Sequence, residues 1–441
     1  MITSTTPRIL VLGASGLIGR FITDDLRQRG CATVGVARAF SPSQRTSPFD
    51  IELPIMALDA PALASLIRAH EIDVVINCLG VLQDGPGSDT AAVHREFVAR
   101  VLAAITACGR RVRFIHISIP GTADEDHTAF ATTKREAEQL IASSDIPYAI
   151  LRPGFVIAPS AYGGSAMVRA LAALPVDLPA RDAATPFQPV AVADIAATIA
   201  WLAMRPIDDE ATRAVSWDLM QPEAVTLGDV VDAFRRSFGT TDWPRVALPA
   251  PLINLGAFAG DLCSRLGWMP PMRTTAIAEL RRGVHGDPAP WIAATGITPT
   301  PLDAVGVRGA TIQDKWFARL FLIKALIIAS LVLFWVASGS IALFVSFPAT
   351  TAVLTTHGWP EGFAIPFAAI TSMMDISVGL LIAFRKTAAF GLAAGILVSL
   401  GYMLGCAILT PDLWLEPLGA LVKTGPAIVL MLVALLMMDN R

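Results

Sequence analysis

The chain has 441 residues, of which 54% are hydrophobic and only 16% charged, and its mean hydropathy is +0.57. This composition excludes an entirely soluble protein and predicts that part of the chain lies in a lipid bilayer. The net charge of −3, without any basic run, argues against a nucleic-acid partner. Five scattered cysteines predict neither a disulfide framework nor a zinc site.

The segment from Arg8 to Gly19 reads RILVLGASGLIG. Its short apolar run is typical of a buried parallel strand, and the residues from Arg20 to Arg29 predict a helix. Between them, Gly13, Gly16 and Gly19 permit a tight turn, close approach of a pyrophosphate and packing of the helix on the sheet. The turn therefore predicts a dinucleotide site at a helix N-terminus rather than an ordinary loop.

A second apolar strand, Ala32–Ala37, ends at Arg38, and no acid follows it. An acid at this point would accept a hydrogen bond from a ribose 2′-hydroxyl, whereas an arginine suits a 2′-phosphate. Arg38 therefore favours NADP(H) over NAD(H), the alternative being a solvated loop residue.

Strands and helices continue to alternate after Arg38. The predicted strands are Ile55–Leu58, Ile72–Asn77, Val112–Ile117 and Tyr148–Leu151, and the predicted helices are Ala60–His70, Ala91–Cys108 and Ala129–Ser143. This alternation predicts an α/β fold with a doubly wound parallel sheet, a Rossmann domain.

The motifs resemble those of the extended or atypical short-chain dehydrogenase/reductases. They are residues 13–19, Asp59, the run Asn77-Cys-Leu-Gly80, the run His116-Ile-Ser118, Lys134 and the run Arg152-Pro-Gly154. The resemblance implies that Asp59 binds adenine, Lys134 holds the nicotinamide ribose and Pro153 begins the loop under the nicotinamide. It also implies that the cofactor is lined by Ser15, Leu17, Ile18, Leu79 and Gly80 in addition to the glycines. Asp59 could equally be the N-cap of the helix from Ala60, and the two roles are compatible.

One departure limits what the resemblance implies about catalysis. The family's proton donor is a tyrosine four residues before the lysine, and here that position is Phe130. Lys134 and Ser118 are the remaining catalytic candidates, but neither replaces the phenol. The standard alcohol/carbonyl mechanism is therefore expected to be absent, whereas cofactor binding is not excluded.

We expect the Rossmann domain at residues 1–155 and the rest of the dehydrogenase-like domain, with a variable substrate lobe, at 156–310. In that lobe, Gln188–Asp194 resembles the family's stretch before a helix that packs on the sheet, and a helix capped by Thr226 is expected to run to Phe238.

Residues 311–441 predict an all-α bundle of four transmembrane helices, because only nine charged residues occur among the last 117 positions. The expected spans are about 321–345, 362–384, 387–410 and 418–438. Lys315 and Arg319 precede the first span, Lys324 lies at its start, and Arg385 and Lys386 lie between the second and third spans. The positive-inside rule then predicts a multi-pass protein of a bacterial inner membrane with both termini in the cytoplasm.

The pattern Asp375-x-x-x-Gly379, the pair Arg385-Lys386 and the run from Pro411 to Lys423 resemble DoxX-like membrane domains. The link Ala310–Trp316 also resembles bacterial proteins in which such a domain follows an NAD(P)-binding domain. Because an isolated charge in a bilayer is costly, Asp375 and Lys423 are predicted to face the bundle interior and to interact. The alternative is that Lys423 extends to the membrane surface and that Asp375 is protonated.

Two functions remain open from the sequence. The first is a membrane-anchored NAD(P)H oxidoreductase that passes hydride to a lipid-soluble acceptor such as a quinone, which the resemblance to DoxX-like domains favours. The second is a nucleotide-binding accessory or assembly protein of a respiratory membrane complex without turnover, which Phe130 favours. The partners expected in either case are a nicotinamide nucleotide and the lipid bilayer.

Overall fold

The computed structural model describes residues 6–42, 44–45, 47–85, 87–307, 310–415 and 419–438. The chain forms two compact units. Unit 1 comprises Met1–Gly260 and Pro271–Ala318, and unit 2 comprises Asp261–Pro270 and Arg319–Arg441.

Unit 1 is built on a seven-stranded parallel sheet with the strand order β10-β6-β5-β4-β1-β2-β3. The strands are β1 (Arg8–Leu12), β2 (Ala32–Ala37), β3 (Asp50–Glu52), β4 (Val74–Asn77), β5 (Arg113–Ile117), β6 (Tyr148–Pro153) and β10 (Ala214–Leu219). The register pairs Leu12 with Asn77 and Asn77 with His116, so the carboxyl ends of the three central strands lie side by side. Ligands of such sheets bind at this edge.

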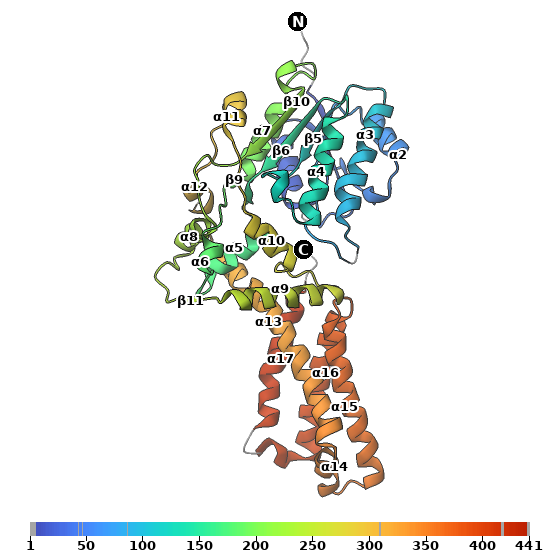
Figure 1. The fold of residues 1–441 in the computed structure, drawn as a ribbon. Helices are drawn as coiled ribbons and strands as arrows, with labels where there is room; N and C mark the ends of the chain where they lie inside the picture. Colours follow the sequence, from blue (N-terminus) through green and yellow to red (C-terminus); the bar gives the residue numbers. More distant parts are fainter. Residues whose placement is uncertain are drawn as a thin grey trace. The chain divides into compact units, whose positions relative to one another are not determined.

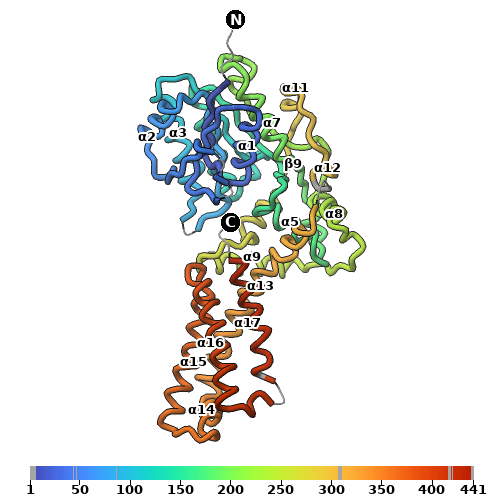
Figure 2. Tube along the Cα trace, turned by 180° about the vertical axis from the view of Figure 1, so that it is seen from behind, coloured from blue at the N-terminus to red at the C-terminus, as the bar shows by residue number. Residues whose placement is uncertain are grey.

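Helices cover both faces of the sheet, as Figures 1 and 2 show from opposite sides. Alternate residues of β1 point into different cores: Ile9 packs with one cluster and Leu10 with the other. The first cluster includes residues of α1 (Leu17–Gln28) and α7 (Val192–Ala203). The second includes residues of α2 (Ala60–Ala69), α3 (Phe97–Ala107) and α4 (Ala129–Ala142). The predicted doubly wound α/β fold is confirmed.

The third strand lies earlier in the chain than the sequence predicted. The prediction of a strand at Ile55–Leu58 is wrong, because Ile55–Ala57 is a 3-10 turn and the strand is β3 at Asp50–Glu52. Pro54 precedes the turn, and a proline has no N–H for a sheet ladder. Ile55 is buried among the helices on one face of the sheet, so its apolar character reflects core packing.

The remainder of unit 1 has a core of its own, which contains Val168, Phe187 and Phe234. Its strands are β7 (Phe155–Ile157), paired with β9 (Pro189–Ala191), and β8 (Val176–Asp177), paired with β11 (Val246–Ala247). Its helices are α5 (Gly163–Ala173), α6 (Ala180–Ala183), α8 (Leu227–Phe238), α10 (Thr274–Arg282), α11 (Ala289–Thr295) and α12 (Leu302–Val307). As predicted, Thr226 caps α8.

Helices are the only regular secondary structure among the described residues of unit 2. Its helices are α13 (Ile312–Ser340, continued by a π-helical turn at Ile341–Val345), α14 (Phe347–Thr356), α15 (Glu361–Ala383), α16 (Ala388–Leu409) and α17 (Ala420–Leu436). The first residues of α13 belong to unit 1, and α9 (Ala250–Arg265) also contributes residues to both units. A small core forms around Leu331, Trp335 and Met431.

Three helices of the described chain are long and apolar enough to cross a membrane: Ile312–Val345, Glu361–Ala383 and Ala388–Leu409. Many of their large apolar side chains, such as Leu333, Leu397 and Ile408, are exposed, as lipid contact requires. The fourth predicted span corresponds to α17, which has 17 residues; its expected start at residue 418 lies outside the described residues.

Candidate functional site

The turn between β1 and α1 can accept an anionic ligand. Gly13 has φ = +85°, and a Cβ atom at Gly19 would lie 2.2 Å from the Gly13 carbonyl oxygen. Neither position therefore tolerates a larger residue without a backbone shift. Gly16 is the N-cap of α1 and supplies no side-chain cap, so the helix leaves its first N–H groups, from Leu17 onward, for a ligand. These features fit a pyrophosphate at the helix N-terminus.

Side chains at the ends of β2 and β3 bear on recognition of a ribose. Arg38 is exposed immediately after β2. Glu52, which pairs with Ala37 at the end of β3, was not considered as a candidate from the sequence. It accepts a hydrogen bond from the Phe40 N–H at 2.9 Å and pairs with Arg45 at 2.5 Å, and these two contacts lower the pKa of its carboxyl. Glu52 is thus engaged within the loop, and Arg38 remains the charged group that follows β2 directly.

Asp59 caps α2. Its Oδ1 accepts a hydrogen bond from the Ala62 N–H at 2.9 Å. The structural role predicted as the alternative is therefore present, and the carboxylate's second oxygen leaves the adenine role open as a proposal.

Lys134 lies in α4 and is only 4% exposed. Its Nζ donates to the Ile117 carbonyl oxygen at 2.7 Å, and a Cβ atom at Gly80 would lie 3.7 Å from it. Burial is the largest influence and lowers the pKa of Lys134 to about 8. Burial also raises the pKa of the neighbouring Cys78, so Cys78 is a thiol that packs rather than a nucleophile.

A histidine that the sequence reasoning missed lies beside Phe130. His94 Nε2 accepts a hydrogen bond from the Val81 N–H at 3.1 Å, so the ring proton is on Nδ1, which donates to Thr133 Oγ1 at 2.9 Å. Burial and then the charge of Lys134 lower the pKa of His94 to about 3. The Phe130 ring meets His94 edge-on, with 5.5 Å between centroids. The imidazole is therefore neutral and cannot replace the missing phenol as an acid.

The other predicted residues lie at the carboxyl edge of the same sheet. Ser118 follows β5 and is 4% exposed, and Pro153 ends β6. Leu79 follows β4, and its N–H donates to Asn77 Oδ1 at 3.1 Å. The Asn77 amide therefore donates to His116 Nδ1, also at 3.1 Å. These bonds fix the chain between β4 and Gly80.

A chain of ion pairs holds the loop after β5 against α4 and α10. Arg135 of α4 pairs with Asp126 of the loop at 2.9 Å, and Arg282 of α10 pairs with the same carboxylate at 2.8 Å. Glu138 joins Arg135 at 3.2 Å to Arg152 of β6 at 2.7 Å. The segment that follows Ser118 is therefore tied to the helix that carries Lys134.

In unit 2, the predicted interaction between Asp375 and Lys423 is wrong. Asp375 of α15 is buried, but its Oδ1 accepts a hydrogen bond from the Tyr402 hydroxyl of α16 at 2.8 Å. Lys423 is exposed on α17. A neutral phenol on the adjacent helix supplies a partner for the carboxyl group, and the flexible lysine can extend toward polar surroundings. The Tyr402 hydroxyl also lies 3.3 Å from the carbonyl oxygen of Thr371, a residue that lines a cavity of about 190 Å³.

Two families match separate parts of the chain. Residues 9–177 match the NAD dependent epimerase/dehydratase family, and residues 332–432 match the DoxX-like family. The 3-diazoavenalumate denitrifying reductase of a Streptomyces species is 32% identical over 193 residues, which cover 37% of this chain and 62% of that protein. The match thus spans less than two thirds of the relative's length.

Solved structures share the fold of the N-terminal part. The UDP-glucose-4-epimerase of Stenotrophomonas maltophila, with bound NAD, has a TM-score of 0.53 and 19% identity, and the match covers 72% of this chain and 99% of that one. The UDP-glucuronic acid 4-epimerase of Bacillus cereus, in complex with UDP-glucuronic acid and NAD, has a TM-score of 0.51 and 16% identity, with coverages of 71% and 99%. One chain therefore combines a Rossmann fold whose residues 9–177 resemble the NAD dependent epimerase/dehydratase family with a separate part, residues 332–432, that resembles the DoxX-like family.

Proposed function

We propose that this chain, a dehydrogenase-type Rossmann domain joined to a DoxX-like domain, is a membrane-anchored reductase that uses NADPH and needs no tyrosine. The observation that supports the proposal is that the residues predicted to bind the cofactor lie together at the carboxyl edge of the sheet, while a phenylalanine stands where the catalytic tyrosine is expected. The glycine turn and the buried Lys134 are kept, while Phe130 occupies the place of the proton donor. The Streptomyces relative, which is named a reductase, supports the same class of reaction.

In this proposal each residue has a binding role. The N–H groups of Leu17 and Ile18 hold the pyrophosphate, Arg38 pairs with the 2′-phosphate and Asp59 contacts the adenine. Lys134 holds the nicotinamide ribose, for which Gly80 leaves space. The remaining residues expected to line the cofactor are Ser15, Leu79 and Pro153, with Ser118 beside the reacting end.

The bound cofactor supplies a hydride. Reduction of a quinone to a quinol requires one further proton for each hydride. Neither Phe130 nor the neutral His94 can supply this proton, so solvent is its source in our proposal. A quinone is the acceptor that we propose, because it needs no enzyme acid of tyrosine type and dissolves in the membrane. The proposed location is the bacterial inner membrane, with both termini in the cytoplasm.

Cofactor choice tests the nucleotide site. Purified protein should bind NADPH more tightly than NADH, and Arg38→Ala should remove the difference by lowering NADPH affinity about tenfold or more, since a charge-assisted contact contributes about 1.5–3 kcal/mol. Arg111→Ala is the matched control, because Arg111 is exposed at the amino end of β5 and pairs with Asp208. Equal affinity of the wild-type protein for both nucleotides would refute the role of Arg38.

Turnover tests the reductase function. In membrane vesicles that contain the protein, NADPH oxidation should depend on added quinone, and Lys134→Met should abolish it. Tight NADPH binding without oxidation by any quinone would instead support the second candidate, a non-catalytic accessory protein of a respiratory complex. Phe130 is the observation that favours this second candidate.

A further inference from the structure

The exposed side of α9 is apolar. Leu252, Leu255, Phe258 and Leu262 are 52%, 62%, 64% and 53% exposed, and their spacing of three or four residues places them on one face. On the other side of the helix, Ile253 and Ala257 are buried. A stripe of large apolar residues on the outside of a helix marks a surface that contacts another apolar phase or partner.

The residues at the end of α9 and after it, 261–270, belong to unit 2. Trp268 donates from Nε1 to the carbonyl oxygen of Ala383, the last residue of α15, at 2.7 Å. The Arg385 N–H donates to the Leu266 carbonyl oxygen at 3.0 Å, and the Arg385 guanidinium lies 5.5 Å from the centre of the Trp268 ring. Tryptophan and arginine at the end of a membrane-spanning helix are typical of the bilayer interface. The residues that follow α9 are thus hydrogen-bonded to the end of α15, the end at which we expect the bilayer interface.

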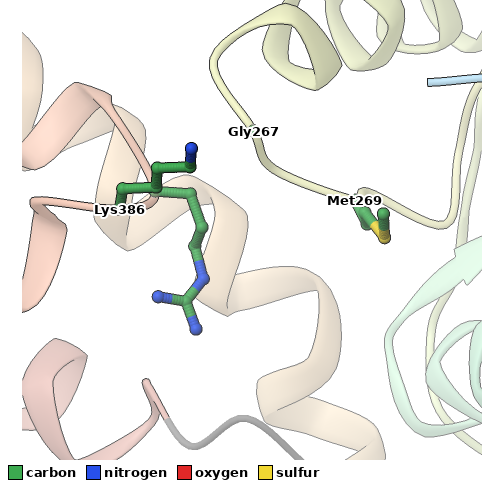
Figure 3. A pocket seen from close by; sticks show the side chains of 4 residues that line it. Gly267, Met269 and Lys386 are labelled. Atoms are coloured by element: carbon green, nitrogen blue, oxygen red, sulfur yellow. The ribbon is translucent and has the colours of Figure 1, made fainter. Parts of the chain in front are cut away.

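Cationic groups accompany the apolar ones at this end of unit 2. A cavity of about 480 Å³ is lined by Gly267, Met269, Arg385 and Lys386. Figure 3 shows the side chains of Met269 and Lys386 on opposite sides of it. Met269 is 76% exposed, and Lys386 forms no ion pair with the described part of the chain. Arg265, the last residue of α9, is exposed as well.

We propose that α9 is a surface anchor that lies in the headgroup layer of an anionic phospholipid bilayer. Leu252, Leu255, Phe258 and Leu262 enter the boundary of the acyl chains, while Arg265 and Lys386 contact lipid phosphates. Apolar insertion together with basic side chains is the combination by which amphipathic helices bind anionic membranes. This inference is independent of the proposed reductase activity.

Cys263 provides a direct probe because it is an exposed free thiol next to Leu262. A nitroxide label on Cys263 of the full-length protein, with Cys78 and Cys406 replaced by alanine, is compared in vesicles of phosphatidylcholine with and without phosphatidylglycerol. The control label is on Glu223→Cys with Cys263→Ser, because Glu223 is exposed before α8. We expect the label on Cys263 to be reached by oxygen at least several-fold better, relative to a water-soluble nickel chelate, than the control label. Phosphatidylglycerol should increase this ratio.

Variants separate the contribution of the apolar side chains of α9 from that of the basic side chains of Arg265 and Lys386. Leu255→Glu with Phe258→Glu should bring the label into water, whereas Leu255→Met should not. Arg265→Gln with Lys386→Gln should remove the dependence on phosphatidylglycerol. Equal access of the nickel chelate to both labels in the otherwise native chain would overturn the proposal, even if a variant fails to fold. Dipolar broadening between labels on Cys263 would also overturn it, because a second copy of the chain would then cover this face.

Discussion

Lys134 is a cation that the fold buries between α4 and the ends of β4 and β5. Its ammonium has the Ile117 carbonyl oxygen as a hydrogen-bond partner. The surroundings hold its pKa near 8, mainly through burial, whereas an unfolded chain leaves a lysine near its ordinary value of about 10.4. Below pH 8 the folded protein therefore carries the cost of a buried charge.

This difference predicts how stability changes with pH. Between about pH 8 and 10.5 the unfolded chain binds more protons at this residue than the folded chain, so the free energy of unfolding should rise with pH. Relative to Lys134→Met, the wild-type protein should gain on the order of 3 kcal/mol over this range. The measurement is urea unfolding of both proteins at pH 7.5 and pH 10, followed by the fluorescence of the buried Trp217 and Trp291. A constant difference between the two proteins would contradict the shift.

The residues that the sequence identified at the nucleotide site belong to local motifs. Gly13 and Gly19 belong to one turn, and the pattern of strand, turn and helix in the sequence predicts that both positions need glycine. His94 and Tyr402 escaped notice because their partners are distant in the chain: Thr133 is 39 positions from His94, and Asp375 is 27 from Tyr402. Sequence spacing alone gives no sign of such contacts between packed helices.

At the scale of elements, the starts of two helices could be predicted from their N-cap residues. Asp59 and Thr226 begin α2 and α8 where the sequence placed them, because a side-chain oxygen followed by an apolar helical pattern is a local signal. The third strand was misplaced because β3 has only three residues and contains two acids, so no apolar run marks it. Its position depends on contacts with β2, which local pattern does not show.

The N-cap of α4 gives a prediction about the site. Thr128 Oγ1 accepts a hydrogen bond from the Ala131 N–H at 3.1 Å and donates to Glu279 of α10. Thr128→Ala should lower the free energy of unfolding by about 1–2 kcal/mol and should also weaken NADPH binding, because α4 carries Lys134. Thr226→Ala is the matched control: it removes the N-cap of α8, at a similar cost, but should leave NADPH affinity unchanged. Titration calorimetry on both variants makes the comparison, and equal losses of affinity would show a general effect on stability.

At the scale of the whole molecule, composition predicted the division into a soluble and a membrane part. It did not predict that residues 261–270, which precede the apolar spans, would belong to unit 2. Their membership depends on contacts of Trp268 and Leu266 with residues more than a hundred positions later. Among the described residues, three helices are long and apolar enough to span a membrane where four were expected, because the described part of α17 has only 17 residues.

The last prediction concerns the orientation of unit 2 in the membrane. Lys324 of α13 donates to the Met437 carbonyl oxygen, and Arg385 donates to that of Met438 at 3.0 Å. Basic residues therefore gather at the end of the unit where α17 finishes. The opposite end has His357 bonded to Asp412 at 2.7 Å, and the sequence between residues 346 and 361 contains no lysine or arginine.

Positive residues are retained on the cytoplasmic side, so the end with Arg385 should face the cytoplasm and the end with His357 the opposite compartment. In a background with Cys263→Ser and Cys406→Ala, Thr355→Cys should react with a membrane-impermeant maleimide added to intact cells. Lys386→Cys should react only after the membrane is opened. Thr355 and Lys386 are both exposed, so the two thiols are matched in accessibility apart from the membrane. Reversed labelling would place the end with Arg385 outside the cytoplasm. It would also contradict the proposed use of NADPH, because NADPH is a cytoplasmic cofactor.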